Sequence, residues 1–181
     1  VLKCPGPRRC EHQPPADSGQ QTNRWTASGR DNGRPQIVAV VQKKQEGTDL
    51  MKIFDGCRAF IWRHYQENNC NAYLIDKDKR ILIDPGHEHL FRHVRQGLDE
   101  AGVALAAVDL VVSTHGHPDH LEGVRMFGKP TLFAINDEEY TYIRDLAGGY
   151  LRIPEPDFFL REGELNVGSI SFQVIRTPGH T

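Results

Sequence analysis

A mostly apolar segment, Val108 to Val112, leads directly into a short loop that carries three histidines and one aspartate. Continuous apolar runs of this length are typical of a strand that is buried on both faces of a sheet. The loop places His115, His117, Asp119 and His120 within six positions of one another. Imidazole nitrogens and carboxylate oxygens are preferred ligands of zinc and related divalent ions. The segment therefore predicts a buried strand with a metal site at its end. The alternative is a polar loop in which the histidines occur by chance.

Strand-like segments dominate the chain from Met51 onward. They are predicted at Lys52–Phe54, Ala59–His64, Asn71–Asp76, Arg80–Asp84, Val108–Ser113, Thr131–Ile135, Phe158–Leu160, Glu164–Val167 and Ser169–Arg176. Short turns separate the first four, which predicts an antiparallel meander. Helical periodicity covers Leu90–Ala101, with Gly102 as the C-cap, and a second helix is predicted from the N-cap Asn136 to Leu146. This mixture predicts an α/β fold in which helices cover the outer face of a sheet.

The first fifty residues differ in composition from the rest of the chain. They are rich in Pro, Gly, Gln, Arg and Asn, and the first methionine of the chain is Met51. We therefore expect residues 1–50 to be a disordered extension or upstream sequence, and residues 51–181 to form one domain. The alternative is a genuine tail or linker. Cys4, Cys10 and His12 lack a fourth ligand at suitable spacing, so a metal knuckle there is disfavoured.

Charge and hydropathy give no reason to expect a nucleic-acid or membrane partner. The formal net charge is −2, and neither the first fifty residues nor the remainder is strongly charged. The chain contains no apolar run of the length of a signal peptide or a membrane span. We therefore expect a soluble cytoplasmic protein that acts on a small molecule, and the oligomeric state is left open.

The spacing of the loop residues suggests how they could share metal ions. His115 and His117 are two positions apart, so on an extended backbone their side chains point the same way and can bind one ion. Asp119 and His120 follow Pro118, where the chain must turn, and could face a neighbouring ion. Two adjacent metals would activate water and polarise a carbonyl or phosphoryl oxygen. Asp119 would also orient the resulting metal-bound hydroxide or accept its proton.

A tetrahedral site requires a third protein ligand for the first ion. The segment Thr177-Pro178-Gly179-His180 offers one, because it also follows directly after a predicted strand. We therefore expect His180 to complete the first site. The alternative is an ordinary surface histidine on a Pro-Gly turn.

Three segments together resemble the metallo-β-lactamase-fold hydrolases. Ser113 to Gly123 is similar to the HxHxDH motif of that family, Asp84-Pro85-Gly86 to its strand-end Asp-x-Gly, and Thr177 to Thr181 to its later T-P-G-H-[ST] block. The resemblance covers residues 52–181 and implies a four-layer αββα sandwich with the metals at one edge, between the sheets. It identifies the chemistry more specifically than the substrate.

The resemblance also implies a role for each residue of the site. His115, His117 and His180 would hold the first metal, and Asp119 and His120 the second. Asp84 would orient the ligand loops through hydrogen bonds, unless it is only a turn residue before Pro-Gly. The complete site would hold two Zn²⁺ ions, with iron or manganese as alternatives.

The chain departs from the family pattern at its C-terminal end. The family's bridging Asp and final His would lie beyond Thr181, so we expect a C-terminally truncated fragment that carries the N-terminal half to two-thirds of the fold. We expect it to bind metal weakly and to be poorly active alone, with an exposed apolar sheet face.

A metal-dependent hydrolase is the function that these residues favour. Metal-bound hydroxide would attack a thioester, ester or related bond, and glyoxalase-II-like thioester hydrolysis is the common intracellular case in the family. The alternatives are a mononuclear iron persulfide dioxygenase, which has a similar motif, and an inactive fragment of the fold.

Overall fold

The computed structural model describes residues 30–31, 34–35, 49–146 and 152–181. The chain divides into two compact units, Val1–Gln45 and Glu46–Thr181. In the first unit, the described residues form two short antiparallel strands, β1 (Arg30–Asp31) and β2 (Arg34–Pro35). The predictions for the rest of residues 1–48, including Cys4, Cys10 and His12, lie outside the described residues.

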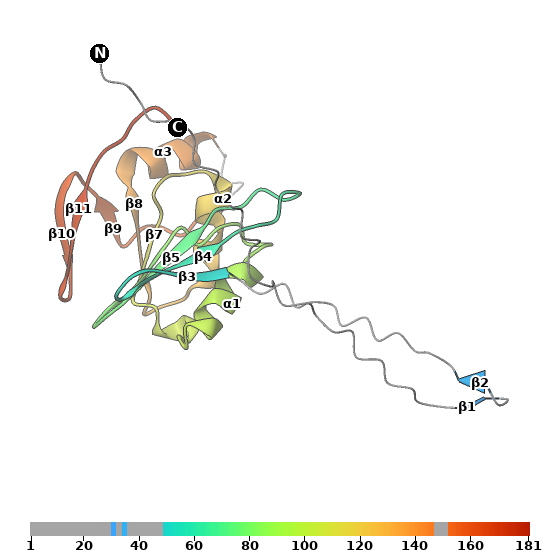
Figure 1. Ribbon diagram of the computed structural model, residues 1–181. Coiled ribbons are helices and arrows are strands. Elements are labelled where there is room, and N and C mark those ends of the chain that lie inside the picture. Colours follow the sequence, from blue (N-terminus) through green and yellow to red (C-terminus); the bar gives the residue numbers. More distant parts are fainter. Residues whose placement is uncertain (1–29, 32–33, 36–48, 147–151) are drawn as a thin grey trace, which may run out of the picture. The chain divides into compact units, whose positions relative to one another are not determined.

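A seven-stranded mixed sheet forms the centre of the second unit (Figure 1). Its strands follow one another in chain order: β3 (Asp49–Phe54), β4 (Cys57–Ile61), β5 (Ala72–Asp76), β6 (Arg80–Ile83), β7 (Leu110–Val112), β8 (Leu132–Asn136) and β9 (Phe158–Leu160). Strands β3 to β6 form an antiparallel meander, as the turn pattern predicts. Strands β6 to β9 are parallel, so the loops after β6, β7 and β8 leave the same edge of the sheet.

Helices cover one face of this sheet and enclose the larger part of the core. They are α1 (Arg92–Glu100), η1 (Leu105–Ala107), α2 (Pro118–Leu121), η2 (Glu122–Met126) and α3 (Asp137–Leu146). Fully buried members of this core include Phe60, Leu74, Leu82, Leu98, Val111 and Leu121. The two predicted helix caps are confirmed, although α1 begins at Arg92 rather than at Leu90. Gly102 adopts the left-handed conformation after α1, and Asn136 accepts hydrogen bonds from the first backbone amides of α3.

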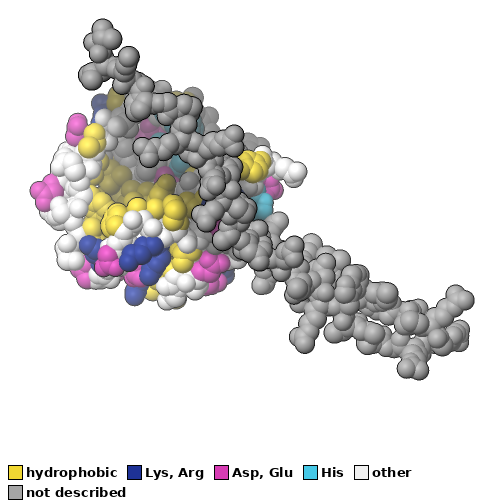
Figure 2. Space-filling model, in the orientation of Figure 1, with side chains coloured by type: hydrophobic (Ala, Val, Ile, Leu, Met, Phe, Trp, Pro, Cys, Tyr) yellow, Lys and Arg dark blue, Asp and Glu magenta, His cyan; other side chains and the backbone are white. Residues whose placement is uncertain are grey.

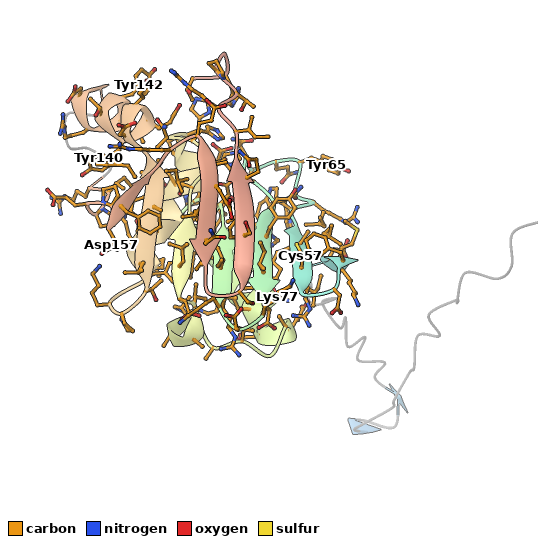
Figure 3. The ribbon with its side chains drawn as sticks, turned by 90° about the vertical axis from the view of Figure 1, so that its left-hand side faces the viewer. Cys57, Tyr65, Lys77, Tyr140, Tyr142 and Asp157 are labelled. Carbon is orange, nitrogen blue, oxygen red and sulfur yellow. The ribbon has the colours of Figure 1, made fainter. Side chains whose placement is uncertain are left out.

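A β-hairpin covers the opposite face of the sheet. Its strands, β10 (Gly163–Val167) and β11 (Ile170–Val174), form a separate two-stranded sheet that lies over the large one (Figure 3). Ile170 packs there against Ile81, Leu110 and Ala134. The turn of the hairpin is fixed by Asp78, whose carboxylate accepts hydrogen bonds from Ser169.

The predicted mixed α/β class is confirmed, and the chain has the N-terminal portion of the expected fold. The described residues supply a helical layer, the large sheet and the first strands of a second sheet, but within them no helices cover the outer side of the hairpin.

Hydrophobic side chains gather on one face of the molecule (Figure 2). Exposed large hydrophobic residues include Met51, Ile53 and Phe54. No described helix is long and apolar enough to cross a membrane.

Candidate metal centre

The candidate site lies where the parallel strands end. Ile83 at the end of β6 is in register with Val112 near the end of β7, and Val112 is in register with Ala134 of β8. The loops that follow β6 and β7 therefore begin side by side, and β8 continues to Asn136. This register brings Asp84 next to the histidine loop, although 30 residues separate it from Thr114.

Three of the predicted ligands form one cluster. One ligand atom from each of His115, His117 and His180 lies within 4.8 Å of the other two. His115 Nε2 and His117 Nδ1 are 3.1 Å apart, and the His180 ring lies 4.9 Å and 4.7 Å from the rings of His115 and His117, centroid to centroid. With metal–nitrogen distances of about 2.0–2.1 Å, nitrogens at adjacent corners of a tetrahedron are about 3.3 Å apart. His115 and His117 match this spacing, and all three ligand atoms lie close enough together to make the cluster a candidate site for a single ion.

Gly116, which lies between His115 and His117, lets the histidine loop pack closely against α3. A Cβ atom at this position would lie 2.4 Å from Cδ1 of Ile143 in α3, so a larger residue would have to displace either the Ile143 side chain or the loop. The backbone amide of Gly116 also donates a hydrogen bond of 2.9 Å to Glu139 Oε2 at the start of α3. Helix α3 therefore holds the two-residue spacing between His115 and His117 in place.

The other two predicted ligands form a second group beside the first. Pro118 occupies the first turn of α2 and places Asp119 and His120 in that short helix. His120 Nε2 lies 3.8 Å from Asp119 Oδ2, and its ring lies 4.1 Å from the His115 ring. The two groups therefore adjoin, as expected for a pair of metal positions. Assignment of all five residues as metal ligands remains a prediction.

Asp84 connects the elements of the site. It is 4% exposed, and its φ of 54° is unusual for a residue other than glycine. Its carboxylate accepts hydrogen bonds from the Thr114 backbone amide (2.7 Å) and hydroxyl (2.8 Å), and Oδ2 lies 3.0 Å from His120 Nδ1. These contacts are the ones that the predicted orienting role of Asp84 would use, and the role itself stays a prediction.

The surroundings give the two central histidines opposite pKa shifts. Burial, together with the neighbouring His120, lowers the pKa of His115, which favours the neutral imidazole that binds metals. Burial also acts to lower the pKa of His120, but the hydrogen bond and charge of Asp84, with the charge of Asp119, raise it overall. When its Nδ1–H donates to Asp84, His120 presents Nε2 as the atom for a metal.

Two supporting residues of the site escaped the sequence analysis. Asn68 Nδ2 donates a hydrogen bond of 2.8 Å to Asp119 Oδ2 from a loop 51 positions earlier. Glu139 accepts the hydrogen bond from the Gly116 amide and was not among the predicted site residues. No local pattern distinguishes Asn68 from its neighbour Asn69, and only the folded arrangement reveals its contact.

Comparison with known proteins places this site in a family. The family model of the metallo-beta-lactamase superfamily matches residues 65–181. A probable metallo-hydrolase of Methanocaldococcus jannaschii is 34% identical over 61% of this chain and 58% of its own length. Hydroxyacylglutathione hydrolases of Idiomarina loihiensis and Francisella tularensis subsp. novicida are 32% and 31% identical, over 59% and 66% of this chain and 36% and 43% of their own lengths.

Solved structures agree at the level of the fold. A subclass B3 metallo-beta-lactamase of Bradyrhizobium japonicum superposes with a TM-score of 0.62 at 18% identity, over 75% of this chain and 54% of that one. The FEZ-1 metallo-beta-lactamase of Legionella gormanii gives 0.61 at 18% identity, over 73% and 54%. The chain spans about half the length of these proteins and 58% of the M. jannaschii relative. It belongs to the metallo-beta-lactamase superfamily, a superfamily of metallo-hydrolases.

Proposed function

We propose that this chain carries the metal centre of a hydrolase that cleaves the thioester or a related ester bond of a small molecule. The observation that carries the proposal is the cluster of His115, His117 and His180, whose ligand atoms lie within 4.8 Å of one another. We propose zinc as the metal, because three imidazoles with a vacant fourth position are typical of catalytic zinc sites. A bound zinc ion would act as a Lewis acid and lower the pKa of a coordinated water.

The protein's own groups would position the water and the metal ligands. Asp119, which accepts a hydrogen bond from the Asn68 amide, would orient the attacking water or accept its proton. Asp84 would keep the ring of His120 turned toward the second metal position. Glu139 would keep the backbone of the histidine loop in place through Gly116.

The degree of sequence identity to the different relatives favours a thioester as the substrate. Two hydroxyacylglutathione hydrolases are 31–32% identical to this chain, whereas the lactamases of B. japonicum and L. gormanii are 18% identical and indicate the fold alone. The matched region covers less than half of those hydrolases, so we expect a low rate from the chain by itself.

The test is hydrolysis of S-lactoylglutathione by the zinc-loaded chain, measured as release of free thiol. His117→Ala removes one ligand of the proposed site, and His64→Ala removes a histidine outside it. We expect a low rate in the parent chain, an equal rate in H64A and no rate above background in H117A. Equal rates in the parent chain and H117A would contradict the proposal. Oxygen consumption with glutathione persulfide and bound iron, without thioester cleavage, would favour a dioxygenase instead.

A further inference from the structure

A second group of metal-binding side chains lies outside the centre described above. One ligand atom from each of His87, His89 and Glu122 lies within 4.8 Å of the other two. Two of these residues follow the Asp84-Pro85-Gly86 turn, and the third begins η2, just after the histidine loop. The group shares no residue with the proposed hydrolytic centre. We propose that these three residues form a separate binding site for a divalent transition-metal ion such as Zn²⁺.

The contacts within the group bring the ligand atoms together. His87 Nδ1 lies 2.8 Å from Glu122 Oε2, and the rings of His87 and His89 are 4.8 Å apart, centroid to centroid. An ion bound by His87 and Glu122 would replace this direct hydrogen bond between the two side chains. Two imidazoles and one carboxylate are a common ligand set for zinc, and such sets leave a further position for water.

The backbone holds the two sides of this site in place independently of any metal. Gly123 N donates a hydrogen bond of 2.7 Å to Gly86 O, and a Cβ atom on Gly123 would lie 2.5 Å from the carbonyl oxygen of Pro85. The amide of His87 donates to Asn69 Oδ1 at 2.9 Å. The loop after β6 and the start of η2 are thus joined at short range. The site would therefore need only side-chain rotation, not loop rearrangement, to close around an ion.

Burial and charge are also suitable for a metal ion. The side chains of His87 and Glu122 are each 19% exposed, whereas His89 is exposed and lies at the rim. Partial burial strengthens the attraction between the Glu122 carboxylate and a cation, and an exposed rim lets the ion enter. The adjacent Glu88 pairs with Arg125, so that carboxylate already has a cationic partner.

Zinc stoichiometry of the whole chain, measured by equilibrium dialysis at fixed free zinc, tests the site. His89→Ala removes the rim ligand without disturbing a buried contact. Glu122→Gln keeps an oxygen acceptor for His87 but removes the negative charge. His64→Ala is the control for loss of a histidine elsewhere. We expect H89A and E122Q each to bind one zinc fewer than the parent chain, and H64A to bind the same number.

His117→Ala separates this site from the proposed hydrolytic centre. H117A should lose the zinc of that centre and keep the one bound by His87, His89 and Glu122. Circular dichroism and thermal unfolding of each variant establish that a lost ion does not reflect a lost fold. If folded H89A and E122Q both bind as many zinc ions as the parent chain, the second site does not exist, whatever the result with H117A.

Discussion

Asp84 Oδ2 lies 3.0 Å from His120 Nδ1, at the point where the ends of two parallel strands meet the start of a helix. The same carboxylate accepts two hydrogen bonds from Thr114, so one buried side chain joins β6, β7 and α2. A carboxylate that accepts the Nδ1–H of a histidine fixes the ring orientation and makes Nε2 a better metal ligand. We therefore expect Asp84 to couple the local folding of the sheet edge to the geometry of the proposed metal centre.

Asp84→Asn should weaken both the fold and the metal site. The amide offers only one acceptor oxygen and brings an N–H donor toward a group that is itself a donor. We expect a loss of about 1–3 kcal/mol in the free energy of unfolding and roughly a 10–100-fold loss of zinc affinity. Urea unfolding of the metal-free chain and zinc titration measure the two effects separately.

Asp109→Asn is the matched control for this variant. Asp109 Oδ2 accepts a hydrogen bond of 2.8 Å from the Arg80 amide. This contact lies where β6 and β7 begin, at the opposite end of these strands from Asp84. This variant should lose some stability but should keep the zinc affinity of the parent chain. Equal losses of zinc affinity in D84N and D109N would show that Asp84 acts only through general stability.

Asn68→Ala tests whether the loop before β5 positions Asp119. The variant removes a hydrogen bond of 2.8 Å to a carboxylate, which is worth about 0.5–1.5 kcal/mol for an ordinary pair. We expect roughly a two- to tenfold fall in the rate of thioester hydrolysis, and zinc binding by His115, His117 and His180 should be unchanged. Asn166→Ala removes a similar amide–carboxylate hydrogen bond on the distant hairpin, to Glu164, and should leave the rate unaltered.

Gly97→Ala should destabilise the domain although alanine favours helices. Gly97 lies inside α1, and a Cβ atom there would be 2.4 Å from Cγ of the fully buried Phe60 ring. Overpacking of this kind costs about 1–3 kcal/mol. Thermal unfolding should show a lowered Tm. Arg95→Ala, at an exposed position of the same helix, should change the Tm little, and an unchanged Tm in G97A would mean that α1 can move away from β4.

The strands, the helices and the central candidate ligands can be predicted from local sequence patterns, but the contacts that support these residues cannot. Alternation and apolar runs identify the strands, and the short loop brings His115 to His120 together by chain connectivity alone. The Asp84–His120 contact spans 36 positions and needs the parallel register of β6 and β7. Asn68 reaches Asp119 from a loop without regular structure, so no periodic pattern marks it.

The cluster of His87, His89 and Glu122 also could not be predicted from the sequence alone. His87 and His89 are visible as a pair in the sequence, but Glu122 joins them only because Gly123 packs against the Pro85-Gly86 turn. This contact requires a glycine where the two backbone segments meet in the fold, and no spacing of residues along the sequence marks that position. Ligand sets assembled across such close backbone contacts need a structure to be recognised.

His93 should make the fold less stable in acid. It is 8% exposed, and its Nε2 lies 3.0 Å from the Phe60 carbonyl oxygen, to which it donates. Burial lowers the pKa of His93, and the hydrogen bond to Phe60 opposes this effect without cancelling it. The unfolded chain, with a histidine pKa of about 6.5, therefore binds more protons than the folded chain. The contribution of His93 to stability is complete above about pH 6.5 and falls as the pH drops from there toward the folded-state pKa.

His93→Gln isolates this effect, because glutamine keeps an N–H donor for the Phe60 carbonyl but does not titrate. Urea unfolding at about pH 7.5 and about pH 5 gives the change in the free energy of unfolding for each protein. The other titrating groups are common to both proteins, so they cancel when the two changes are subtracted. We expect the parent chain to lose more stability between these pH values than H93Q. An equal or larger loss in H93Q would mean that protonation of His93 does not oppose folding, and that its ring is accommodated as a cation beside Phe60 and Trp62.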